Sequence, residues 1–224
     1  MRPIQLIIFD LDGTLIDSSH DIVAAMQQLL RELYLPALGS AQIMSFVGQG
    51  VDWLVRQCLA ACGVAGEHAL RSAVERYRQL YSQDALRYTH LYVGVRETLE
   101  RLRLGGFDLA VCTNKPESIA RKVLDGLGLS GYFLALLGGD SLEKRKPDPA
   151  PLQLLMELLD VEAAQTLMVG DSAYDIAAGH AAGTWTCAVT YGFHDITSEG
   201  PPQPNVVISQ FSQLLSVLGL EDSG

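Results

Sequence analysis

The sequence has little positive charge and no long apolar run. Its 16 lysines and arginines face 26 aspartates and glutamates, which gives a formal net charge of −10. This balance argues against a nucleic-acid partner, because phosphate backbones require a basic surface. No apolar stretch approaches the ~18 residues of a membrane span. The N-terminus lacks the apolar segment and cleavage site of a signal peptide. We therefore expect a cytoplasmic protein, a monomer or homodimer, without a membrane partner.

Cysteine is also scarce, with four residues scattered through apolar stretches, as is usual in a reducing compartment. Cys58 and Cys62 lie four residues apart on a predicted helix, but "CLAACG" offers no further metal ligand. We interpret this pair as core packing. With 48% apolar and 19% charged residues, the 224-residue chain can fill the core of one full domain and a smaller insert.

Short apolar runs that end in polar or glycine-rich turns recur along the chain. They are "LIIFD", "LAVCTN", "LALLGGD", "TLMVGD", "TCAVT" and "NVVIS". Helical patterns such as "PESIARKVLDGLG" and "PAPLQLLMELLD" separate most of them. This alternation predicts an α/β fold with a Rossmann-like, doubly wound parallel sheet, which binds ligands at the carboxyl ends of its strands. The late segment "ISQFSQLLSVLGL" predicts a final amphipathic helix.

A long helical segment interrupts this pattern after the first strand. In residues 17–89, apolar positions recur every three or four residues, and Ser18, Ser40 and Gly66 mark plausible helix starts. Some seventy helical residues cannot lie within the sheet. We therefore predict a helical domain over 17–89, placed above the strand-end site, and an α/β core over 1–16 and 90–224.

Two aspartates follow the first apolar run directly. Asp10 and Asp12 emerge at the carboxyl end of the "LIIF" strand, and Gly13 lets the backbone bend closely around a ligand. Two neighbouring carboxylates repel each other, so the pair requires a cation, a shared proton or both. A plain turn could also use Asp and Gly for backbone reasons. The further motifs described below favour a functional site over a plain turn.

A second acidic pair ends "TLMVGDSAYD". Asp171 follows the strand, and Asp175 lies on the first turn of a helix that we expect to begin near Ser172. These acids could simply cap that helix. However, two acidic pairs at carboxyl ends of parallel strands make an oxygen-rich site that suits a hard cation such as Mg²⁺.

Complementary groups for an anion lie between the two acidic pairs. Thr113 and Asn114 end another strand just before a helix, where a hydroxyl and free N–H groups suit a phosphate oxygen. The run Lys144, Arg145 and Lys146 could be a solvated surface. Because Lys146 precedes Pro147 just after a strand end in an acidic chain, we predict that it points inward.

In this order, "DLDGT", "TNK", "KPDP" and "GDSAYD" resemble the four motifs of the haloacid dehalogenase superfamily of phosphatases. The resemblance implies a magnesium-dependent phosphomonoester hydrolase. Asp10 would be the nucleophile that forms an aspartyl-phosphate, and Asp12 the general acid and base. Mg²⁺ would be held by Asp10, the main-chain oxygen of Asp12 and Asp171. Asp175 would stand at the edge of the metal site, as a ligand or orienting a metal-bound water.

The resemblance also assigns the remaining motifs. Thr113, Asn114 and Lys146 would bind the phosphoryl group, and the helical insert resembles a C1-type cap. "VGQG", "VCTNKPES" and "VTYGF" further resemble bacterial phosphoglycolate phosphatases, so the expected small phosphorylated metabolite is 2-phosphoglycolate. The cap residues expected to set substrate specificity are Gly48, Gln49, Gly50 and Arg56.

Several alternatives stay open. Other small esters, such as sugar phosphates, nucleotides or pyrophosphate, are possible substrates. Phosphomutases with this cap carry a histidine five residues beyond Asp17, where this chain has Ile22; we interpret His20 as a polar residue at a helix start. A phospho-acceptor module would keep the phosphate on Asp10, but Asp12 favours turnover because an acceptor needs no leaving-group acid.

Overall fold

Six parallel strands form the central sheet of the computed structural model, which describes residues 4–196 and 202–220. They are β1 (Leu6–Phe9), β4 (Asp108–Cys112), β5 (Ala135–Leu137), β6 (Thr166–Gly170), β7 (Trp185–Val189) and β8 (Val206–Ile208). Their order is β5-β4-β1-β6-β7-β8, with every neighbouring pair parallel. The chain fills one side of β1 first and then the other. The strand order therefore reverses beside β1, and in such sheets ligands bind at this switch point.

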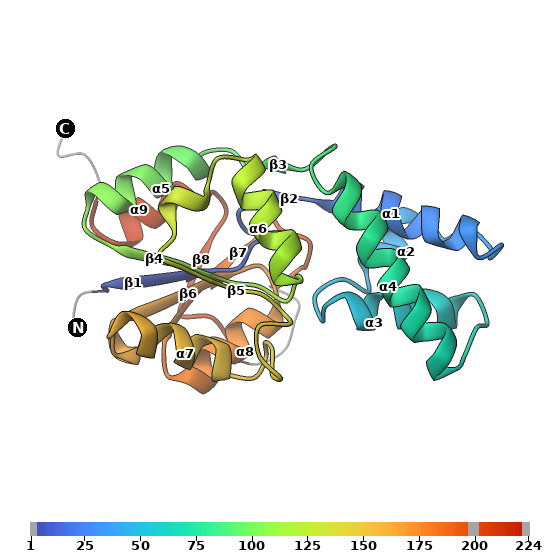
Figure 1. Ribbon diagram of the computed structural model, residues 1–224. Helices are drawn as coiled ribbons and strands as arrows, with labels where there is room; N and C mark the ends of the chain where they lie inside the picture. Colours follow the sequence, from blue (N-terminus) through green and yellow to red (C-terminus); the bar gives the residue numbers. More distant parts are fainter. Residues whose placement is uncertain (1–3, 197–201, 221–224) are drawn as a thin grey trace. The chain divides into compact units, whose positions relative to one another are not determined.

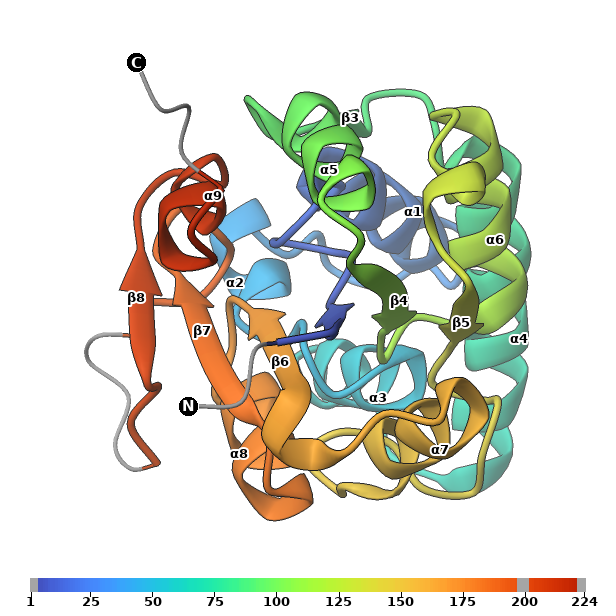
Figure 2. The same ribbon diagram turned by 90° about the vertical axis from the view of Figure 1, so that its left-hand side faces the viewer.

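Helices cover both faces of this sheet (Figures 1 and 2). One face carries α5 (Val95–Leu104), α6 (Glu117–Gly126) and α9 (Gln213–Val217), and the other α7 (Ala150–Leu159) and α8 (Ala173–Ala182). The predicted doubly wound α/β fold is confirmed. All residues of β1 are fully buried because both of its faces are covered.

Side-chain alternation along β1 supplies both layers of the core. Leu6 and Ile8 belong to a buried cluster with residues of α7 such as Leu152. Phe9 instead packs its ring against Phe133 and Phe211, at centroid distances of 6.3 and 5.6 Å. Successive residues of a strand point to opposite faces, so four apolar residues anchor two helical layers.

Four elements differ from the sequence prediction. The helix expected over "ISQFSQLLSVLGL" is restricted to the five residues of α9, and Gly219, at φ +74°, lies just after it. The patterns did not predict α5 or the short strands β2 (Ile16–Asp17) and β3 (His90–Leu91), which pair as a separate two-stranded sheet. Two-residue strands are too short to show alternation.

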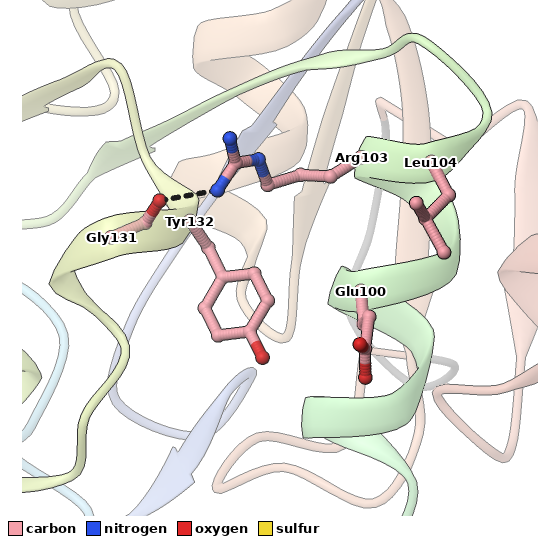
Figure 3. Close-up of a pocket in the computed structure, with 5 residues that line it drawn as sticks. All are labelled: Glu100, Arg103, Leu104, Gly131 and Tyr132. Atoms are coloured by element: carbon pink, nitrogen blue, oxygen red, sulfur yellow. Dashed lines mark hydrogen bonds between the residues drawn. The ribbon is translucent and has the colours of Figure 1, made fainter.

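A surface cavity of about 440 Å³ lies between α5 and the 3-10 turn η1 (Ser130–Tyr132) (Figure 3). Arg103 of α5 donates a hydrogen bond to the carbonyl oxygen of Gly131 at 2.6 Å. The other lining residues are Glu100, Leu104 and Tyr132. None of them follows the carboxyl end of a strand, so this cavity is separate from the site predicted there.

The chain divides into two compact units. One contains the described residues up to Asp17 and those from Leu91 onward; the other is Ser18–His90. The second unit holds α1 (Ser19–Glu32), α2 (Ser40–Met44), α3 (Val51–Ala61) and α4 (Glu67–Asp84). The predicted helix starts at Ser18, Ser40 and Gly66 are confirmed to within one residue.

Within this second unit, Asp21 on the first turn of α1 binds the segment that precedes β3. Its buried carboxylate accepts hydrogen bonds from the main-chain N–H groups of Tyr88 and Thr89 and from the Thr89 hydroxyl, the last at 2.7 Å. The two ends of the helical segment are therefore joined by charge-assisted hydrogen bonds.

All four cysteines are free thiols. Cys58, Cys112 and Cys187 are buried, and burial raises the pKa of each of these thiols to about 12. In the part of the chain that the structure describes, no helix is both long and apolar enough to cross a membrane.

Candidate active site

The first acidic pair stands at the end of β1 in a tight turn. The N–H of Asp10 still donates to the carbonyl of Val169, which continues the parallel ladder by one residue. Beyond it, the N–H of Gly13 donates to the carbonyl of Ile16 at 2.9 Å, so the chain folds back at once. This turn places both Asp10 and Asp12 at the switch point of the sheet.

Gly13 is required in that turn for two reasons. Its φ is +81°, and a Cβ atom at this position would lie 2.3 Å from Oδ2 of Asp171. Gly192 approaches the same carboxylate, since its Cβ would lie 2.3 Å from the Asp171 Cβ. The main chain at these two glycines therefore lies so close to Asp171 that a side chain at either position would clash with it.

We expect Gly13→Ala to destabilise the protein by about 2 kcal/mol more than Gly106→Ala does. Gly106 has almost the same φ, +83°, but a Cβ there meets nothing within 4 Å. The control therefore carries the left-handed strain alone, about 1–2 kcal/mol, and Gly13→Ala adds the clash with Asp171. Urea unfolding of both variants measures the difference. Equal losses would contradict this account of the turn.

Three carboxylates gather at the strand ends. Asp10, Asp171 and Asp175 each offer one oxygen, and these oxygens all lie within 4.8 Å of one another. Asp171 follows β6, and Asp175 lies on the first turn of α8, as predicted. Asp175 also caps this helix: its Oδ2 accepts hydrogen bonds from the Ser172 N–H and hydroxyl. The capping and cluster interpretations therefore both hold.

Lys146 enters this cluster from the other side. Its Nζ lies 2.6 Å from Oδ1 of Asp175 and 3.0 Å from Oδ1 of Asp10, and it donates to the carbonyl of Cys112 at 2.6 Å. The side chain is only 2% exposed, so it does point inward. Burial alone would lower the pKa of Lys146, but the two carboxylates outweigh it and raise that pKa.

The charges of this cluster do not balance. Three ionised carboxylates and one ammonium leave a net charge of −2. Burial, and then the charges of Asp175 and Asp171, raise the pKa of Asp10 to about 7, although Lys146 acts in the opposite direction. A further positive charge at this position would favour the ionised form of Asp10.

The cluster fits a hard divalent cation. Its ligand atoms are all carboxylate oxygens, and its net charge of −2 would balance the +2 charge of such an ion. Oδ1 of Asp10 is buried and, within the described residues, accepts no hydrogen bond, although Lys146 forms an ion pair with it. The residues present can therefore hold a metal ion.

Thr113 and Asn114 lie where predicted, just after β4, and both are buried. The N–H of Thr113 donates to the carbonyl of Leu137, and Nδ2 of Asn114 donates to the carbonyl of Lys146 at 2.9 Å. The amide of Asn114 therefore fixes the main chain of the segment that carries Lys146.

Three residues at this site were not predicted from the sequence. Lys115 forms an ion pair with Asp12, with Nζ 2.7 Å from Oδ1. The Phe193 N–H donates to Oδ2 of Asp171 at 2.7 Å, and Nδ1 of His194 lies 3.2 Å from the same oxygen. These residues lie in "TNK" and "VTYGFH", two segments that stand at the ends of strands. Their position at strand ends was the one feature of the sequence that could have predicted a role at the site.

The residues expected to recognise substrate lie in the other unit. Gly48 and Gly50 have φ of +122° and +89°, so the loop before α3 uses conformations open to glycine. Arg56 of α3 pairs with Glu67 at 2.9 Å. The contribution of these residues and Gln49 to substrate recognition stays a prediction.

Comparisons with known proteins agree with this site. Residues 7–189 match the family model of haloacid dehalogenase-like hydrolases. The phosphoglycolate phosphatase of Vibrio parahaemolyticus is 37% identical, with 98% of each chain covered, and that of Pectobacterium atrosepticum is 38% identical, covering all of this chain and 96% of the relative.

A solved structure is also similar to this chain. The crystal structure of a predicted phosphoglycolate phosphatase from Haemophilus somnus superimposes with a TM-score of 0.90 at 32% identity, covering 97% of this chain and 99% of that one. The family match includes the end of β1, Lys115, Lys146 and the acids after β6. The resemblance noted in the four motifs is thus confirmed: the chain belongs to the haloacid dehalogenase-like hydrolases.

Proposed function

We propose that this protein is a magnesium-dependent phosphomonoester hydrolase that works through an aspartyl-phosphate on Asp10. One observation carries the proposal: the Asp10 carboxylate lies among Asp171, Asp175 and Lys146 at the switch point of the sheet. A nucleophile that attacks a phosphate dianion needs concentrated positive charge around it. This cluster supplies one ammonium and the ligands for a cation.

The metal ligands in this proposal are Asp10, the main-chain oxygen of Asp12 and Asp171, with Asp175 as a ligand or behind a bound water. When bound, Mg²⁺ would neutralise the charge that builds up on the phosphoryl oxygens. Phe193 and His194 hold Oδ2 of Asp171, and such contacts orient a ligand.

The first half-reaction transfers the phosphoryl group to the protein. An oxygen of Asp10 forms a bond to phosphorus as the ester P–O bond breaks, and Asp12 gives its proton to the departing alcohol oxygen. Lys146, the Thr113 hydroxyl and the N–H groups of Asn114 would bind the phosphoryl oxygens. In the second half-reaction, Asp12 takes a proton from water, which attacks phosphorus and regenerates Asp10.

We propose 2-phosphoglycolate as the substrate, hydrolysed to glycolate and phosphate. The similarity to phosphoglycolate phosphatases over nearly the whole chain supports this choice. The helical unit Ser18–His90 would act as the cap and recognise the substrate carboxylate through the Gly48–Gly50 loop.

Initial rates of phosphate release over a panel of esters, with Mg²⁺ and with chelator, test the proposal. The panel includes 2-phosphoglycolate, sugar phosphates, nucleotides and pyrophosphate. We expect kcat/KM for 2-phosphoglycolate to exceed the others by at least about tenfold, with loss of activity in chelator, because removing the metal leaves charge on the phosphoryl oxygens uncompensated. A flat, metal-dependent profile would keep the mechanism and reject this substrate. Stable phosphate on Asp10 without turnover would indicate a phospho-acceptor instead.

A further inference from the structure

Lys115 is a buried cation that the proposed mechanism does not use. Its side chain is 2% exposed, against 15% for its partner Asp12, and Nζ lies 2.7 Å from Oδ1 of that carboxylate. Ordering a lysine costs side-chain entropy, and its ammonium loses hydration on burial. A lysine held in this way beside a proposed general acid calls for a functional explanation.

The backbone of Lys115 is fixed as well. Its N–H donates to the hydroxyl oxygen of Thr113 at 3.3 Å, and its carbonyl accepts a hydrogen bond from the Gly139 N–H at 2.8 Å. Lys115 therefore joins the loop after β4, which carries the phosphate-binding Thr113, to Asp12 in the turn after β1. Two elements far apart in sequence meet through this ion pair.

We propose that Lys115 is a positioning residue that fixes the Asp12 carboxylate relative to the bound phosphoryl group. The inference rests on the proposed function. A proton donor must come within about 2.6–3.2 Å of the oxygen that receives the proton. Without the Lys115 ammonium, the Asp12 carboxylate would lose the contact that joins it to the loop after β4. An ammonium 2.7 Å from Oδ1 restricts rotation of that carboxylate before substrate binds.

A different role would follow if Lys115 bound the phosphoryl group itself. Lys146 already lies between Asp10 and Asp175, whereas Lys115 contacts the residue that handles protons. The observed contact therefore favours action through Asp12. The two roles make different predictions for esters with different leaving groups.

The two roles can be distinguished because they affect the charge on the leaving oxygen differently. When the bond from Asp10 to phosphorus forms, the electron pair of the breaking P–O bond stays on the leaving oxygen. An alkoxide must receive the Asp12 proton to leave as an alcohol, whereas 4-nitrophenolate leaves readily without one. A misplaced Asp12 should therefore slow alkyl phosphates strongly and 4-nitrophenyl phosphate little.

The test compares kcat/KM of the full-length protein with Mg²⁺ for 4-nitrophenyl phosphate and for the best alkyl phosphate of the panel. This constant covers only the steps up to release of the leaving group. For Lys115→Met we expect a loss of about 10²-fold with the alkyl ester and less than about fivefold with the aryl ester, within the range of general acid catalysis. Lys115→Arg should recover part of the loss. Lys144→Met, which removes an exposed lysine, should change neither constant.

A double mutant identifies the route of the effect. If Lys115 acts through Asp12, adding Lys115→Met to Asp12→Asn should cost less than about threefold more. Equal losses with both esters, or independent losses in the double mutant, would overturn the proposal and indicate phosphate binding or a purely structural role. If thermal melting shows that Lys115→Met does not fold, Lys115→Gln takes its place in the same comparison. Failure of the proposed function would appear separately, as absence of Asp10-dependent turnover in the unmutated protein.

Discussion

Replacing Asp10 with asparagine is expected to lower kcat/KM for every phosphate ester by at least about 10⁴-fold. The amide has nearly the same shape as the carboxylate but cannot attack phosphorus, and losses of this size follow removal of a nucleophile in other enzymes. The variant should stay folded. It removes one of three crowded negative charges, and burial already raises the pKa of Asp10 to about 7.

Two measurements test this prediction together. Steady-state rates give the loss of activity, and mass spectrometry after an acid quench should detect phosphate on the unmutated protein and none on Asp10→Asn. Asp160→Asn is a matched control: Asp160 is exposed and adopts φ +56°, which asparagine tolerates. Activity within tenfold of the unmutated protein in Asp10→Asn would rule out nucleophilic attack by this residue.

Lys146→Met is expected to cost about 3–5 kcal/mol of unfolding free energy in chelator, together with a loss of kcat/KM of about 10²–10³-fold. Breaking a buried ion pair leaves its partner charges uncompensated. Here, Asp10 and Asp175 would both lose the ammonium that lies within 3.0 Å of each. In the proposed mechanism, the catalytic loss would come from one missing charge-stabilising donor at the phosphoryl oxygens.

Urea unfolding in chelator and in Mg²⁺ separates the two effects. In the proposed function a divalent cation binds the same carboxylates, so we expect Mg²⁺ to restore part of the stability but little of the activity. Lys144→Met, two residues away, is the control. Its side chain is 66% exposed and pairs with Asp148 at the surface, so its removal should cost less than about 1 kcal/mol. A stability loss below 1 kcal/mol in Lys146→Met would show that the buried pair is dispensable.

Much of the architecture of the α/β core could be predicted from short sequence patterns. Fully apolar runs such as "LIIF" belong to buried parallel strands, and six such runs correspond to the six strands of the sheet. The acids after β1 and β6 could be placed together because parallel strands end at the same edge. Asp10, Asp171 and Asp175 do meet there, and Lys146 turns inward as its position suggested.

Other features were not encoded in any short pattern. The C-terminal helix α9 is shorter than its amphipathic sequence indicated, and Gly219, at φ +74°, lies just after its end. The cap assignment of Ser18–His90, and the specificity roles of Gly48, Gln49, Gly50 and Arg56, stay proposals.

The sequence by itself determined the sheet, the helical segment after its first strand, and the acidic and basic motifs at the strand ends, because these depend on periodicity and on the direction of parallel strands. Only the tertiary structure decided which charges pair. Lys115 is separated by 103 positions from Asp12, and Lys146 by 29 from Asp175. Ion pairs depend on distances of 3 Å between side chains, and only the packed fold brings residues so far apart in sequence to that distance.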